Sequence, residues 1–299
     1  MKKTISQYQK AFTTEIENLK SNKNVLAVMV FGSMVSGDLW DGSDIDLFVI
    51  ANDEGSNSIK NIFTEEEGIS IHIKLMGKNK FLRLNENDLK GGFFHRIFAS
   101  SKLVFSNDME ITARYDSGRY YPDIDRRKWN MVYAGNVIKS IDTCKKYLIN
   151  DGIYTAYCEA VKCVDDFSKL YVNYSGYMIN KDAVSMLMNI DEKFKKHVDN
   201  LLFDKSDIKK SIEAMVTYMD LFVNANLKNI ADLLIDYMRK KDCFLSEEDI
   251  NNDLIFKDFN INSEELLNKL WILNIIKKKT REYLLKDGSI LVKENVYYI

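Results

Sequence analysis

The chain has 299 residues, of which 46% are hydrophobic and 29% are charged, and its formal net charge is −2. This composition excludes a disordered chain, and the length predicts more than one domain. A charge near neutral gives no long-range attraction to nucleic acid or to an anionic membrane. No apolar run reaches the roughly 18 residues of a membrane span, and the start lacks a signal-peptide core, so we expect a cytoplasmic protein.

The first third of the chain predicts a small β-sheet with flanking helices. Two apolar runs have the length and composition of buried strands, and a third run alternates, which places Ile69, Ile71 and Ile73 on one face. The predicted elements are a helix at 4–20, strands at 24–33, 44–52, 68–76 and 101–108, and a helical piece at 93–100. The fold class predicted for this part is therefore α+β.

The pattern changes after a linker near residues 110–122, which holds the single proline, Pro122. A helical pattern follows and predicts a helix bundle. The tail predicts helices and then two strands around Asp287-Gly288, a strong hairpin signal, and this is the element order of a winged helix. The predicted domains are 1–115, 123–225 and 227–299.

The tail has a balanced charge, because residues 227–299 hold twelve Lys or Arg and thirteen Asp or Glu. Its predicted recognition helix, SEELLNKLWILN, has two glutamates and one lysine, which is a poor pattern for contact with phosphates. DNA binding is possible but not favoured. A structural or dimerising role is favoured, and a homodimer is possible.

Two aspartates stand in the strand DIDLFVIAN. Side chains at positions i and i+2 of a strand share a face, so Asp44 and Asp46 are expected side by side while Ile45 and Leu47 face the core. Adjacent anions repel each other, and a divalent cation with oxygen ligands stabilises such a pair. Mg²⁺ takes one or two carboxylates and fills other positions with water and substrate phosphate. The pair therefore predicts a magnesium and nucleotide site.

Gly32 and Ser33 end the preceding strand. If a helix begins just after them, its free N–H groups face a phosphate, glycine allows close approach of the backbone, and the serine hydroxyl adds a donor. Phosphate and metal are then expected at the same edge of the sheet.

The motif FGS, nine residues, then SDIDLFV resembles the signature of the DNA polymerase β-like nucleotidyltransferase superfamily in its small bacterial form. The resemblance covers residues 25–110. Residues 125–225 resemble the helical domain that follows this core in antibiotic nucleotidyltransferases. The resemblance implies that Gly32, Ser33 and Ser43 bind the nucleotide, with ATP favoured, and that Asp44 and Asp46 hold two Mg²⁺ ions.

The sequence departs from the family pattern at the third catalytic carboxylate. His72 stands at its expected place, and either acts as the general base or is a half-buried strand histidine. Glu159 is the alternative base from the helical domain, or one polar residue on a solvated helix face. Lys74 either steadies a phosphate or keeps its charged end in solvent.

The resemblance thus implies an enzyme that moves a nucleoside monophosphate from an NTP to a hydroxyl of a small molecule and releases pyrophosphate. An acceptor similar to an aminoglycoside or a lincosamide is expected. The alternative is a catalytically degraded core that senses nucleotide and regulates transcription through the winged helix.

Overall fold

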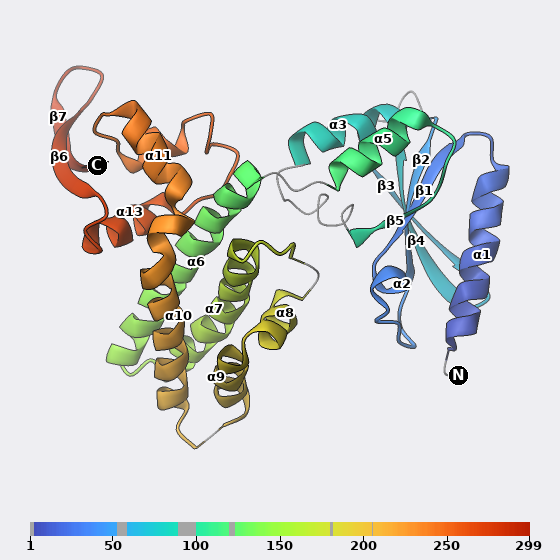
Figure 1. The fold of residues 1–299 in the computed structure, drawn as a ribbon, viewed down its shortest axis with the longest axis horizontal. Helices are drawn as coiled ribbons and strands as arrows, with labels where there is room; N and C mark the ends of the chain where they lie inside the picture. The colour runs from blue at the N-terminus through green and yellow to red at the C-terminus, as the bar shows by residue number, and fades with distance from the viewer. Residues whose placement is uncertain (1–2, 53–58, 89–99, 120–122, 180–181, 205) are drawn as a thin grey trace. The chain divides into compact units, whose positions relative to one another are not determined.

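The computed structural model divides the chain into two compact units, residues 1–122 and 123–299 (Figure 1). It describes residues 3–52, 59–88, 100–119, 123–179, 182–204 and 206–299. The predicted helical piece at 93–100 lies outside these ranges except for residue 100. Pro122 of the predicted linker also lies outside them. Most of the rest of that linker is helix α5, Met109–Gly118.

The first unit is a five-stranded mixed sheet with helices on both faces (Figure 1). The strand order is β3-β4-β2-β1-β5; β2 and β4 are parallel, and the other neighbours are antiparallel. The strands are β1 (Val25–Phe31), β2 (Ile45–Ala51), β3 (Lys60–Glu66), β4 (Ile69–Gly77) and β5 (Lys102–Ser106). Within the described part of this unit the helices, besides α5, are α1 (Ile5–Ser21), α2 (Ser33–Ser36) and α3 (Lys78–Asp88). The α+β class is confirmed.

Strand β2 contributes to two separate cores. Its residues Ile45, Leu47 and Val49 pack in the core on the α1 face, together with residues of β4 and of α1 itself. Phe48 and Ile50 pack in the core on the opposite face, which α3 and α5 cover. The predicted alternation of β4 is also confirmed, because Ile69, Ile71 and Ile73 are buried on the α1 face.

The sequence analysis missed strand β3. The segment KNIFTEE shows no alternation of apolar and polar residues, and six of its seven residues are exposed. It forms a strand because its backbone pairs antiparallel with β4 at the edge of the sheet. An edge strand of this kind has little hydrophobic pattern to detect, since neither of its faces is deeply buried.

The second unit is helical and ends in a hairpin (Figure 1). Its first helices are α6 (Asp123–Ile149), α7 (Ile153–Tyr174), α8 (Ala183–Ile190), α9 (Glu192–Phe203) and α10 (Ile208–Ile230). Helices α11 (Asp232–Lys241), α12 (Glu247–Asn251) and α13 (Ser263–Ile272) follow, and then strands β6 (Lys277–Leu284) and β7 (Ile290–Tyr298). The hairpin at Asp287-Gly288 is confirmed, and Gly288 takes the positive φ of 83° that its turn requires.

One hydrophobic core runs through the second unit. It joins residues of α6, α7 and α10 to Leu266 and Leu270 of α13 and to Tyr297 of β7. The element order of residues 232–298 agrees with the predicted winged-helix order. The winged-helix assignment and the boundary predicted at 225–227 stay predictions. Among the described helices, none has the length and apolar character needed to cross a bilayer.

Asp220 ties three helices of this unit together. It lies on α10 and accepts hydrogen bonds from Lys145 of α6 at 2.6 Å and from Lys269 of α13 at 2.8 Å. Burial opposes ionisation of Asp220, but the hydrogen bonds from both lysines outweigh it and hold its pKa below the usual value. The ion pairs therefore stabilise the fold at neutral pH.

We expect Asp220→Asn to lower the free energy of unfolding by about 1.5 to 3 kcal/mol at pH 7, because it leaves two half-buried lysines without their anion. Urea denaturation measures the loss. Since the pKa of Asp220 is lowered in the fold, its contribution is present above the unfolded value of about 3.9 and disappears as pH falls through the folded value.

The matched control is Asp165→Asn, which removes a more exposed ion pair to Lys169 within α7. That change is expected to cost at most about 1 kcal/mol. Equal losses in the two variants at pH 7 would contradict the role assigned to Asp220.

Candidate functional site

The two predicted carboxylates lie together at the start of β2. Asp46 is the second residue of the strand and pairs in register with Phe31 of β1 on one side and with His72 of β4 on the other. Asp44 lies just before the strand. The Asp44 and Asp46 side chains keep 37% and 30% of their accessible surface, so both carboxylates reach solvent at the end of an otherwise buried strand.

His72 lies close to both carboxylates. Its Nε2 atom is 3.6 Å from Oδ2 of Asp44, and its Nδ1 atom is 3.8 Å from Oδ1 of Asp46. Both aspartates therefore face the same imidazole, which agrees with the shared face that the i, i+2 spacing predicts. The structure brings these three predicted site residues together on the face of the sheet that holds Phe48 and Ile50.

Apolar residues lie next to the carboxylates on the same face of the sheet. Phe31 pairs with Asp46 in the strand register, and its ring stacks on that of Phe48 with centroids 4.6 Å apart. This packing fixes the β1 and β2 backbones next to the aspartates, so the carboxylates are carried by a rigid part of the sheet.

Gly32 lies where β1 turns into helix α2. Its backbone takes φ 72° and ψ −150°, a conformation almost restricted to glycine. A Cβ atom at this position would lie 2.4 Å from Oδ2 of Asp46. Ser33 begins α2, and its hydroxyl donates to the backbone oxygen of Asp44 at 3.4 Å. The structure thus brings Gly32 and Ser33 next to both aspartates.

A turn of residues 40–43 carries the chain into Asp44. The buried Tyr8 hydroxyl donates to the backbone oxygens of Trp40 and Ser43, each at 2.9 Å. The hydroxyl of Ser43 accepts a hydrogen bond from the Trp40 backbone N–H at 3.0 Å. Burial, with the charges of Asp41 and Asp44 nearby, raises the pKa of Tyr8, so this hydroxyl stays protonated as a donor. The contacts of Ser43 hold the turn, and its predicted role in nucleotide binding stays a prediction.

Lys74 and Glu159 differ in how closely the structure links them to this site. Lys74 lies two residues after His72 on the same face of β4, pairs in register with Phe48, and donates to Oδ1 of Asn61 at 3.1 Å. Glu159 belongs to α7 of the second unit. Its side chain keeps 27% of its accessible surface, and its Oε2 atom lies 3.8 Å from Nζ of Lys162. Its role as a base stays a prediction.

The donor set at Asp44 and Asp46 fits a hydrated magnesium ion. Two carboxylates on one face supply hard oxygen ligands, and Gly32 leaves room for Oδ2 of Asp46 against the backbone. Within the described residues, no group of three or more His, Cys, Asp or Glu side chains is arranged to hold a metal. A magnesium ion here would therefore complete its coordination with water and with oxygens of a bound phosphate.

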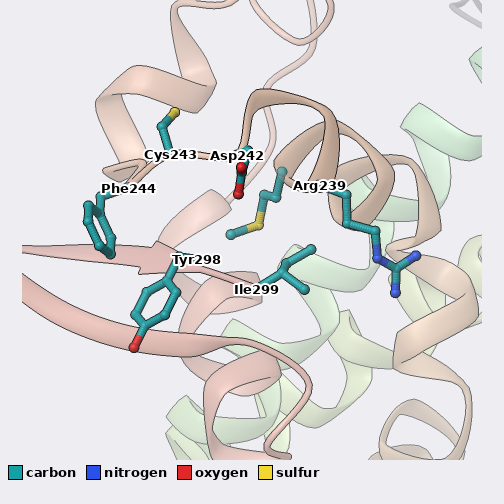
Figure 2. A pocket seen from close by; sticks show the side chains of 7 residues that line it. Arg239, Asp242, Cys243, Phe244, Tyr298 and Ile299 are labelled. Carbon is teal, nitrogen blue, oxygen red and sulfur yellow. The ribbon is translucent and has the colours of Figure 1, made fainter.

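A separate cavity of about 220 Å³ lies in the second unit (Figure 2). Residues from the end of α11, from the segment that follows it and from the end of β7 line it, among them Arg239, Cys243 and Tyr298. None of the residues predicted for the nucleotide site lines this cavity.

We expect Gly32→Ala to lower the free energy of unfolding more than Gly37→Ala does. Both glycines have positive φ, so each substitution carries a backbone cost of roughly 1 to 3 kcal/mol. A Cβ at Gly37 meets nothing within 4 Å, whereas one at Gly32 collides with the Asp46 carboxylate. Urea denaturation of both variants measures the difference, and equal losses would show that Asp46 does not pack against Gly32.

Comparison with known proteins finds similarity to nucleotidyltransferases. Residues 14–110 match the family model described as polymerase beta, nucleotidyltransferase. No curated protein sequence matches the chain. The solved structure of a nucleotidyltransferase-like protein from Exiguobacterium sibiricum aligns over 97% of this chain and 99% of that chain, with 12% identity and a TM-score of 0.65. The two chains therefore share a fold over nearly their whole length.

The spectinomycin adenyltransferase AAD(9) from Enterococcus faecialis, solved with ATP and spectinomycin, is a more distant match. It aligns over 72% of this chain and 98% of that chain, with 13% identity and a TM-score of 0.31, too low to indicate a shared fold. The family match, by contrast, covers Gly32, Asp44, Asp46 and His72. Residues 14–110 are therefore similar to the polymerase beta nucleotidyltransferase family.

Proposed function

We propose that the protein is a magnesium-dependent enzyme that transfers a nucleoside monophosphate from an NTP, with ATP favoured, to a hydroxyl of a small molecule. The observation that carries this proposal is the convergence of Asp44 and Asp46 on His72 next to the Gly32-Ser33 turn. The match of residues 14–110 to the nucleotidyltransferase family model supports nucleotidyl transfer as the reaction class. The similarity of residues 125–225 to the helical domain of antibiotic nucleotidyltransferases supports an aminoglycoside or lincosamide-like acceptor.

The proposed reaction is a displacement at the α-phosphorus. The acceptor oxygen forms a bond to phosphorus, the bond to the bridging oxygen breaks, and pyrophosphate leaves with that electron pair. Magnesium held by Asp44 and Asp46 would acidify the acceptor hydroxyl and neutralise the leaving group. The backbone N–H groups that begin α2 and the Ser33 hydroxyl would bind the triphosphate.

The proton of the acceptor hydroxyl needs a base. His72 is the proposed base because its imidazole lies beside both carboxylates, so it faces the place where the hydroxyl must attack. Glu159 of the second unit is the alternative. The proposed dimerising role of residues 227–299 is independent of this choice.

A nucleotide sensor without turnover is the second candidate. It is favoured by one observation, namely that among the residues the structure describes an imidazole, and not a third carboxylate, lies beside Asp44 and Asp46. In this case the site binds Mg-NTP without turnover, and the predicted winged helix of residues 227–299 regulates transcription. Both candidates require the same nucleotide site, so an assay for product separates them.

The wild-type protein is expected to form a labelled product from ATP and at least one of kanamycin, streptomycin, spectinomycin and lincomycin. Asp46→Asn and Asp44→Asn are each expected to lower the transfer rate at least about 100-fold, because each removes a ligand of the proposed metal. The control is Asp41→Asn, an exposed carboxylate in the preceding turn, which should keep the wild-type rate.

Two results would contradict the proposal in different ways. Transfer that persists in the double variant, Asp44→Asn with Asp46→Asn, would refute the metal assignment. Tight Mg-ATP binding by calorimetry without product from any NTP or acceptor would favour the sensor.

The base is identified by comparing His72→Ala with Glu159→Gln. If His72 takes the proton, His72→Ala lowers kcat about 100-fold to 10,000-fold, and added imidazole restores part of the rate, while Glu159→Gln changes little. Single-turnover assays at saturating ATP measure this. Loss only in Glu159→Gln would assign the proton to Glu159, and failure of imidazole to rescue His72→Ala would point to a structural histidine.

A further inference from the structure

Phe63 is an exposed aromatic residue on the edge strand β3. It keeps 71% of its accessible surface, although moving a phenylalanine ring out of water lowers the free energy. Strand β3 is the last strand of the sheet on its side, so within the described residues no further strand covers its outer edge. The ring of Phe63 is therefore held on the sheet with most of its surface free to contact a ligand.

Phe63 lies in the same row as the site residues. The strand register pairs it with His72, pairs His72 with Asp46, and pairs Asp46 with Phe31, so the four side chains follow one line across the sheet. Its ring meets the imidazole of His72 edge to face, with centroids 4.7 Å apart. The hydrogen bond from Lys74 to Asn61 confirms that alternate residues of β3 and β4 share this face.

The sheet order separates the two sides of the reaction. Strand β1, which leads into Gly32 and Ser33, lies on one side of β2, whereas β4 and then β3 lie on the other. In a displacement at phosphorus, the attacking and leaving oxygens lie in line on opposite sides. If the pyrophosphate leaves toward Gly32 and Ser33, the acceptor hydroxyl must arrive from the side of His72 and Phe63.

We propose that Phe63 is the surface on which the acceptor stacks one ring face, and that the acceptor is a cyclic polyol, such as a saccharide or a cyclitol. This inference rests on the proposed function. The C–H groups on one face of such a ring are apolar and cover the exposed ring of Phe63. Its hydroxyls remain at the ring edge, where His72 and the carboxylates lie next in the row.

The contact between Phe63 and the acceptor ring contributes to binding of the acceptor and not to binding of the nucleotide. Phe63→Ala is therefore expected to raise the KM for the acceptor about tenfold, with kcat and the KM for ATP unchanged within about threefold. Phe63→Tyr keeps the ring and should retain the wild-type KM for the acceptor. Because Phe63 is so exposed, the variants should fold, and their thermal unfolding curves check this.

The matched control is Ile62→Ala. Ile62 is the neighbour of Phe63 on β3, is also exposed, and lies on the opposite face of the strand. It should leave the KM values for the acceptor and for ATP unchanged. The assay uses ATP with whichever of kanamycin, streptomycin, spectinomycin or lincomycin gives product with the wild-type protein.

Three other outcomes of these assays would each overturn a different part of the proposal. An acceptor KM that Phe63→Ala leaves unchanged, in a protein that still forms product, overturns the acceptor surface and leaves the proposed function standing. A KM that rises for ATP in place of the acceptor shows that the ring contacts the nucleotide. Absence of product from the wild-type protein overturns the proposed function, and the acceptor surface with it.

Discussion

The site depends on the double burial of strand β2. Alternate residues of this strand fill two different cores, one against α1 and one against α3 and α5. Such a strand has no solvated face along its middle, so charged side chains are tolerated only where it leaves the cores. Asp44 and Asp46 stand at that end, and the parallel neighbour β4 brings His72 to the same level.

This burial also explains why the carboxylates are well placed. The stacked rings of Phe31 and Phe48 lie beside Asp46 on the same face of the sheet, and the turn before Asp44 is held by the hydroxyl of Tyr8. A glycine is needed at position 32 because a side chain there would displace Asp46. Packing therefore holds both aspartates beside His72, as the proposed cation site requires.

The second unit is organised by a different principle. Its helices share one core that extends to α13 and to β7, and Asp220 links α10 to α6 and α13 through two lysines. The residues predicted as a winged helix thus pack against the helix bundle and share its core. This packing supports a structural role for the tail, in agreement with its balanced charge.

The sequence by itself determined the elements with strong periodicity, the glycine-serine turn, the pair of aspartates and the family they indicate, because local patterns encode burial and turns. Only the tertiary structure decided which side chains share a row. Strand β3 has no hydrophobic pattern, so the position of Phe63 beside His72 follows from pairing between strands and not from spacing along the chain. The shared core of the second unit also depends on contacts between residues more than a hundred positions apart, which local periodicity does not encode.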